Sequence, residues 1–196
     1  MKQYILSDAG ILHKIRALQY RHQFLALAFI AVSFIVTVFL EPQGWGKHLT
    51  WLLTLSGVML YLKARFSSRY RNRILQPEPD IFYSPITGKV LDINKQDGFW
   101  QIRIRKGRFD PVEIRCPMDG CVWQDFAFRK ALKSGNLECR FSAKSIHLVS
   151  EAELQAGAVV ALITGAALCE ISLPETLPLA IQAGDKLAAA ETVITS

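Results

Sequence analysis

The hydrophobic pattern of the chain falls into two parts that meet near residue 76. Residues 24–40 form an uninterrupted uncharged run, and residues 49–62 form a second one after a short segment rich in Pro, Gly and Trp. The first run shows no polar face, whereas a helix at the surface of a soluble domain has one apolar stripe and one polar face. The pattern therefore predicts an N-terminal transmembrane helical hairpin.

The length of the two runs leaves other placements open. Both are shorter than the ~20 residues that cross a hydrocarbon core of ~30 Å. Trp45, Trp51 and Tyr61 extend the apolar region towards the interface, where aromatic rings gather. A spanning hairpin is our first expectation, and the alternatives are a re-entrant hairpin and a helical pair buried in a soluble domain.

Charge sets the expected orientation, because positive residues flank the hairpin on both sides. The first helix is preceded by Lys2, Lys14, Arg16 and Arg21, and the second is followed by Lys63, Arg65, Arg69, Arg71 and Arg73. The basic residues of the connecting segment are Lys47 and His48 alone. By the positive-inside rule both ends of the chain lie on the cytoplasmic side of the cytoplasmic (inner) membrane.

The net charge of +6 is compatible with nucleic acid or with an anionic membrane surface. No stacked aromatic platform accompanies the cations, so we exclude nucleic acid as a partner. The basic segment after the second helix is instead the candidate surface for phospholipid headgroups.

Beyond residue 76 the sequence pattern is typical of short β-strands separated by Gly and Pro. The expected organisation is a cytoplasmic segment at 1–23, a hairpin at 24–62, a basic segment with a Pro-rich linker at 63–80, and an all-β domain at 81–196. We expect strands at 89–93, 100–105, 112–115, 121–125, 137–141, 146–149, 159–163, 168–173 and 192–195, and a short helical turn at 126–134.

Two repeated sequence motifs indicate the architecture of this β domain. The segment from Pro85 to Val90 recurs from Pro117 to Val122 as Pro-x-x-Gly-x-Val, and Gln-Ala-Gly recurs at 155–157 and 182–184. Glycine supplies turn positions with positive φ, and proline fixes the entry of each turn. This arrangement is typical of barrel-sandwich-like domains of the biotinyl/lipoyl type.

The same motifs resemble the phosphatidylserine decarboxylase family, in particular its short, membrane-anchored members, over nearly the whole chain. Tyr83-Ser-Pro-Ile-Thr-Gly-Lys-Val90 resembles the family's Ser-Pro-x-Asp-Gly-x-Val motif, and the catalytic Asp falls on Thr87. In the segment 109–122 the family's His positions are held by Val112 and Arg115. The block 157–174 resembles the self-cleavage region, in which Gly165 is retained and the serine position is Ala166.

The resemblance implies a chemistry that this chain lacks. Family members make a pyruvoyl group by attack of a serine on the preceding glycine carbonyl, and that group is the electron sink for decarboxylation. None of the twelve glycines is followed by serine, and no histidine lies between His48 and His147. We therefore expect no catalytic residues, no pyruvoyl cofactor and no metal, and we interpret the chain as a pseudoenzyme.

The expected function is that of a phospholipid-facing binding, scaffolding or accessory subunit, with the bilayer and a membrane protein as partners. The alternative is an active decarboxylase with a non-standard site, in which Glu113 is the base and Ser142, Ser145 or Ser172 the nucleophile. A zinc site built from Cys116 and Cys121 with Cys139, Cys169 or His147 is a further alternative to buried thiols. The unpaired spacing of the four cysteines fits a reducing compartment.

Overall fold

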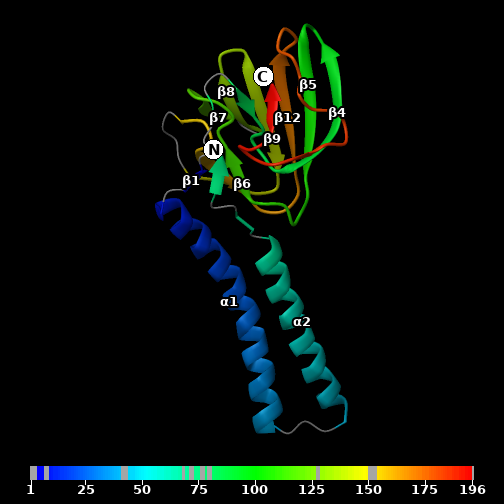
Figure 1. The fold of residues 1–196 in the computed structure, drawn as a ribbon. Coiled ribbons are helices and arrows are strands. Elements are labelled where there is room, and N and C mark those ends of the chain that lie inside the picture. The colour runs from blue at the N-terminus through cyan, green and yellow to red at the C-terminus, as the bar shows by residue number, and fades with distance from the viewer. Residues whose placement is uncertain are drawn as a thin grey trace. The chain divides into compact units, whose positions relative to one another are not determined.

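The computed structural model describes residues 4–6, 9–40, 44–67, 69–70, 73–75, 78, 81–126, 129–149 and 154–195. The chain forms two compact units. Leu12–Ser68 make up the helical hairpin, and Met1–Ile11 together with Arg69–Ser196 make up the unit that we call the β domain (Figure 1).

Two helices form the hairpin, as the hydrophobic pattern predicts. Helix α1 covers Ala9–Leu40 and helix α2 covers Trp45–Ser67. Both are longer than the uncharged runs, because the basic residues that flank the runs continue the helices. Among the described residues, no helix is long and apolar enough to cross a membrane, so the expected transmembrane character of the hairpin is not confirmed.

Small and hydroxyl side chains line the contact between α1 and α2. Gly57 is buried against Ile30, and a Cβ added at Gly57 would lie 2.7 Å from Ile30 Cγ1. The buried Ser33 hydroxyl donates to the Thr50 carbonyl at 2.9 Å and shares a 2.6 Å hydrogen bond with the Thr54 hydroxyl. Helices approach closely where side chains are small, so these positions fix the pairing of the hairpin.

The part of the β domain that the structure describes contains fourteen strands. The described bounds are β1 Tyr4–Leu6, β2 Arg73–Leu75, β3 Phe82–Tyr83, β4 Gly88–Gln96, β5 Phe99–Lys106, β6 Glu113–Arg115, β7 Val122–Phe126, β8 Arg129–Ser134, β9 Leu137–Ala143, β10 Ile146–Leu148, β11 Val159–Ile163, β12 Ala167–Pro174, β13 Lys186–Leu187 and β14 Val193–Thr195. The nine expected strands are confirmed within a few residues at each end. The strand at Arg129–Ser134 replaces the helical turn that we expected at 126–134, which was wrong.

All strand pairs are antiparallel. The largest sheet has seven strands in the order β13-β4-β5-β12-β9-β8-β7, and a second sheet has the order β10-β11-β6. Strands β1 and β2 pair with each other, as do β3 and β14. The long strand β12 lies at the centre of the large sheet and pairs along its length with β5 and β9.

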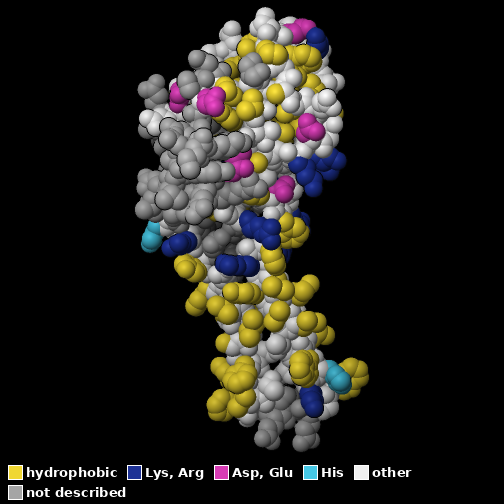
Figure 2. Space-filling model, viewed as in Figure 1, with side chains coloured by type: hydrophobic (Ala, Val, Ile, Leu, Met, Phe, Trp, Pro, Cys, Tyr) yellow, Lys and Arg dark blue, Asp and Glu magenta, His cyan; other side chains and the backbone are white. Residues whose placement is uncertain are grey.

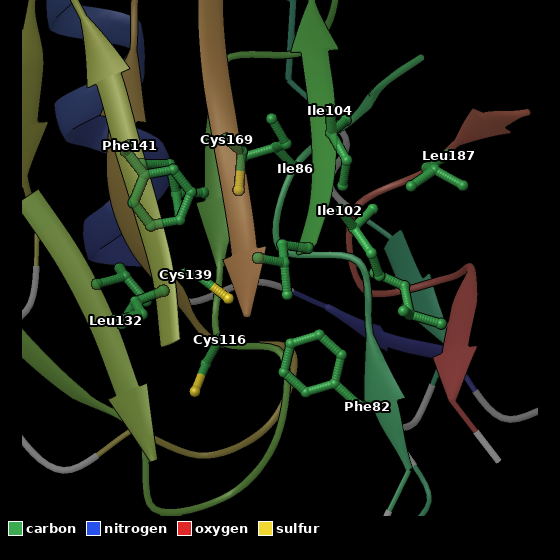
Figure 3. Packing of buried hydrophobic residues seen from close by; sticks show 14 of the residues in the cluster. Phe82, Ile86, Ile102, Ile104, Cys116, Leu132, Cys139, Phe141, Cys169 and Leu187 are labelled. Carbon is green, nitrogen blue, oxygen red and sulfur yellow. The ribbon is translucent and has the colours of Figure 1, made fainter. Parts of the chain in front are cut away.

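One hydrophobic core is shared by these sheets. Strand β12 alternates strictly between buried and half-buried positions, and its inward side chains are Ala167, Cys169, Ile171 and Leu173. Figure 3 shows Cys169 facing the same interior as Ile102 and Ile104 of β5, Cys139 and Phe141 of β9 and Leu132 of β8. Ile114 of β6 and Ile163 of β11 belong to the same cluster, so the second sheet covers the inner face of the first.

The two repeated Pro-x-x-Gly turns lie against each other at the centre of the domain. The Tyr83 amide donates to the Pro117 carbonyl at 2.9 Å, and the Arg115 amide donates to the Pro85 carbonyl at 2.8 Å. Each turn also bonds one Gln-Ala-Gly turn, through Gly184 N to Val90 O at 3.0 Å and Gly157 N to Cys116 O at 2.8 Å. The repeated segments therefore form turns that are hydrogen-bonded to each other and to the two Gln-Ala-Gly turns.

The expectation of a barrel-sandwich-like closure is not confirmed. Among the described strands, no ladder joins the edges of the seven-stranded sheet to those of the three-stranded sheet, so the sheets are open. The short segments around Pro85 and Pro117 are joined by two reciprocal hydrogen bonds and not by a continuous ladder. The coarser expectation, two helices followed by antiparallel sheets, is confirmed.

Gly88 also differs from the expected positive φ of the turn glycines. Gly120, Gly157 and Gly184 have φ values of 72°, 79° and 97°, but Gly88 does not have a positive φ. A Cβ at Gly88 would lie 2.6 Å from the Arg105 carbonyl oxygen, so the close approach of β5 requires glycine there.

We predict that Gly57→Leu separates the two helices, because the added side chain collides with Ile30 and with the α1 backbone. Overpacking of this kind costs about 1–3 kcal/mol. Unfolding of the full chain in detergent, followed by helical circular dichroism, measures the loss. Ser56→Leu is the matched control, because Ser56 is exposed on the same helix; equal stability of the two variants would contradict the packing assignment.

Candidate functional site

Exposed apolar side chains cover much of the face of the hairpin that is seen in Figure 2. Phe24, Phe39 and Trp45 are 73%, 78% and 90% exposed. Further exposed apolar side chains are Leu25, Leu27, Phe29, Val32, Phe34, Ile35 and Val38 on α1, and Leu49, Trp51, Leu52, Leu55, Val58, Met59, Leu60, Leu62 and Phe66 on α2. Soluble monomers do not expose apolar area on this scale, so this surface marks an interaction with lipid or with another apolar partner.

The expected headgroup-binding residues lie at the end of this hairpin and at the entry to the β domain. Lys63 and Arg65 are exposed on the last turns of α2, and Arg69 is exposed beyond its end. Arg73 lies in β2, where its backbone pairs with Leu6. Arg71 lies outside the described residues.

Thr87 and Val112, two of the positions that the resemblance assigns to catalysis, serve the fold in this chain. The Thr87 hydroxyl accepts a hydrogen bond from the Ala189 amide at 3.1 Å. Val112 is buried; its amide donates to the Arg69 carbonyl at 2.9 Å, and its carbonyl accepts from the Ile163 amide at 2.7 Å. Neither side chain offers a group that titrates near neutral pH.

Arg115, a third such position, is fully buried beside the central pair of Pro turns. Its Nη1 donates to the Gly157 carbonyl at 2.9 Å, and its guanidinium carbon lies 5.6 Å from the centre of the Tyr70 ring. A guanidinium has hydrogen-bond donors and no acceptor, so Arg115 cannot act as the general base that a histidine supplies. It clamps one of the Gln-Ala-Gly turns.

Gly165 and Ala166, the remaining assigned positions, form the turn before β12. Gly165 has a φ of 88°, and Ala166 is exposed. The Gly165 carbonyl accepts a hydrogen bond from Lys106 Nζ at 2.9 Å. The same ammonium donates to the carbonyls of Gly107 at 3.2 Å and Asp110 at 3.1 Å.

Lys106 is the principal residue of this region that the sequence reasoning missed. Its side chain is fully buried, and its three N–H donors are matched by three backbone carbonyls. The two-residue alternation of a β-strand could have revealed this burial. Ile102 and Ile104 point inward on β5, so residue 106 is the next inward position. The expected strand ended at residue 105 and so excluded it.

Burial lowers the pKa of Lys106, because desolvation disfavours the ammonium form. The carboxylates of Asp110 and Glu113 oppose this effect by favouring the charge. Glu113 is itself buried on β6. Because the carbonyls use every donor of the ammonium, the arrangement holds the Gly165 turn in place and leaves no free amine for chemistry.

All four cysteines are buried and free, which agrees with buried thiols, the interpretation that we set beside a zinc site. The Cys116 thiol hydrogen-bonds Cys121, which raises the pKa of Cys116 and lowers that of Cys121. Burial, followed by the neighbouring Cys169, raises the pKa of Cys139. Within the described ranges no three His, Cys, Asp or Glu side chains converge to hold a metal ion.

The serines of the alternative active site are dispersed. Ser145 Oγ lies 2.9 Å from His147 Nε2 in an exposed pair. Ser172 Oγ accepts from Gln101 Nε2 at 3.1 Å on the outer face of the large sheet, and Ser142 is exposed on β9. Glu113, the base assumed in that alternative, interacts with Lys106.

No family model, curated protein or solved structure matches this chain.

We predict that Lys106→Met lowers the free energy of unfolding by about 1–3 kcal/mol, because three half-buried carbonyls lose their donor. The variant also changes the pH dependence. With a pKa below the ordinary 10.5, folded Lys106 has released its proton where the unfolded chain still holds it, so wild-type stability rises with pH in that window.

The measurement is denaturant unfolding of wild type and Lys106→Met between neutral pH and pH 10.5. The wild type should gain stability relative to the variant as the pH rises. Lys133→Met, which changes an exposed lysine on β8, is the control and should run parallel to wild type. Parallel curves for Lys106→Met as well would show that burial does not shift this lysine.

Proposed function

We propose that the protein is a membrane-anchored relative of the phosphatidylserine decarboxylases that has lost catalysis. In this proposal the hairpin inserts into the cytoplasmic membrane, and the β domain acts on the cytoplasmic side as a phospholipid-facing binding, scaffolding or accessory subunit. The observation that carries the proposal is the exposed apolar surface that surrounds both helices.

The arrangement of polar groups in the hairpin supports lipid as its surroundings. In hydrocarbon, hydroxyl groups need partners within the protein. The Ser33 hydroxyl bonds the Thr50 carbonyl and the Thr54 hydroxyl across the helix contact, and the hydroxyls of Thr37 and Thr50 donate to carbonyls of their own helices. The buried polar side chains of the hairpin thus lie at the helix contact, and its large apolar side chains are exposed, whereas a soluble helical pair buries its apolar face.

The charges at the hairpin ends support an interfacial position. Lys63, Arg65 and Arg69 follow the apolar part of α2 and are exposed. Cations at a membrane surface are attracted to anionic headgroups by about 1 kcal/mol each. Trp45, at the opposite end of α2, is of an aromatic type that gathers at membrane interfaces.

The environment of Gly165 and Ala166 supports the loss of catalysis. The Gly165 carbonyl is polarised by the Lys106 ammonium, which is a suitable setting for attack on that carbonyl. The following side chain is a methyl group, which has no oxygen to attack with. Thr87, Val112 and Arg115 supply no acid or base in place of the missing nucleophile.

The second candidate is an active decarboxylase with a non-standard site. The hydrogen bond between Ser145 and His147 favours it, because a serine beside a histidine is the minimal activated nucleophile. Formation of a pyruvoyl group at Ser145 would cleave the chain before that residue, which gives a direct distinction between the two candidates.

We expect an intact mass of 22.0 kDa for the purified full-length chain, because no Gly-Ser bond is present to cleave. Mass spectrometry of the protein in detergent, with a carbonyl-reactive probe for a blocked N-terminus, is the measurement. Two fragments, one of them reactive with the probe, would establish the active decarboxylase and reject the pseudoenzyme.

Membrane insertion predicts that the chain stays in the pellet when membranes are washed with alkaline carbonate. Replacing three exposed positions of the hairpin by lysine, Leu27→Lys, Phe34→Lys and Leu55→Lys, should release it, because a charge in the bilayer centre costs about 3 kcal/mol. Three lysines at the exposed β-domain positions Gln96, Asn136 and Gln155 are the control and should leave it in the pellet. Release of the wild type would reject the anchor.

A further inference from the structure

Three cations stand side by side on the outer face of the seven-stranded sheet. Lys186 of β13 is the register partner of Lys89 of β4, and Lys89 is in turn the partner of Arg105 of β5. Directly opposed residues of antiparallel strands project from the same face with Cβ atoms about 4.5–5.5 Å apart. All three side chains are exposed, and we call them the cationic row.

The neighbouring row of the same face shows the arrangement that a stable sheet prefers. There Asp92, Arg103, Glu170 and Arg140 follow one another across four strands with alternating charge. Arg103 forms an ion pair with Asp92, and the Glu170 carboxylate favours the charge of both Arg103 and Arg140. Charge alternation is therefore available to this sheet, and the cationic row departs from it.

No acid compensates the cationic row among the residues that the structure describes. None of its members forms an ion pair with a described carboxylate. Asp185, the nearest acid in sequence, accepts from the Gln182 amide at 2.8 Å within its own turn. Like charges directly opposite one another destabilise a sheet, so a partner with negative charge would relieve this repulsion.

Exposed apolar side chains lie close in sequence to the cationic row. Leu91 lies in the β-bulge of β4, two residues after Lys89, and is 41% exposed. The turn that follows β5 carries Arg108 and Phe109, both exposed, and its Asp110 carboxylate accepts from the Gly107 amide at 2.6 Å. Cations interspersed with exposed apolar groups are the composition of surfaces that bind the interface of anionic membranes.

From these observations we infer that the cationic row, with Leu91 and Phe109, docks the β domain on a bilayer that contains anionic phospholipids. The inference rests on the proposed membrane anchor, which supplies the bilayer. Arg69, where the chain enters the β domain, hydrogen-bonds Val112, three residues beyond Phe109, and only Ser68 separates Arg69 from the end of α2. The first residue of the β domain after the hairpin is therefore hydrogen-bonded close in sequence to the turn that carries Phe109.

The test uses the full chain with Leu91→Cys, reconstituted in bilayer discs of phosphatidylcholine with or without phosphatidylglycerol. The four native cysteines are buried, so a membrane-impermeant maleimide reports the new one. Each cation at an anionic surface strengthens binding roughly fivefold. Labelling should slow by roughly a hundredfold in the anionic discs, and high salt should restore it.

The decisive variant adds Lys89→Gln, Arg105→Gln and Lys186→Gln, and it should label equally fast in both kinds of disc. Its thermal stability should equal or exceed that of the parent, because like-charge repulsion is removed. The matched control, Lys95→Gln, Lys130→Gln and Lys133→Gln, removes the same charge from the other end of β4 and from β8, and should retain the protection.

Three outcomes would overturn the inference: equal labelling in both kinds of disc, protection that persists in the decisive variant, and protection by inorganic phosphate in phosphatidylcholine discs, which indicates a small-anion site. The anchor is measured separately by flotation with phosphatidylcholine alone. If the chain does not float, the anchor fails, and the row is then judged by whether phosphatidylglycerol vesicles bind the parent and not the decisive variant.

Discussion

The reciprocal hydrogen bonds between the two Pro turns are the constraint on which the β domain depends. Tyr83 and Pro117 form one bond, Arg115 and Pro85 form the other, and all four residues are buried. Buried amides and carbonyls need partners, so these two crossing segments fix each other's position. Strands β4 and β6 lie next to them in the chain, which places the inner faces of both sheets around one core.

That constraint explains which features of the fold could be read from the sequence. The repeated Pro-x-x-Gly and Gln-Ala-Gly segments predicted turns that lead into strands, and alternation predicted β5 and β12 closely, because inward Ile, Cys and Leu have the strand period. Closure of the sheets could not be read in this way. It depends on whether edge strands pair, and edge pairing leaves no periodic signal in one chain.

The candidate site shows a similar division. The absence of a nucleophile at Ala166 follows from covalent chemistry and needs no structure. The role of Lys106 needs the fold, because a lysine at the end of a strand is ordinarily solvated and its burial is decided by the three carbonyls that meet it. The strand at Arg129–Ser134 was missed because its Arg, Lys and Ser content obscures a pairing decided by its neighbour β9.

The two anionic-surface candidates of this chain, the basic segment after α2 and the cationic row, differ in what holds them in place. Lys63 and Arg65 of the first are exposed on the last turns of α2, where the energetic cost of clustering solvated cations is small. Those in the row are fixed by register to opposed positions of three strands, so their repulsion is part of the folded state. A negative surface is therefore expected to add stability through the row, whereas binding to the basic segment adds attachment with little effect on the fold.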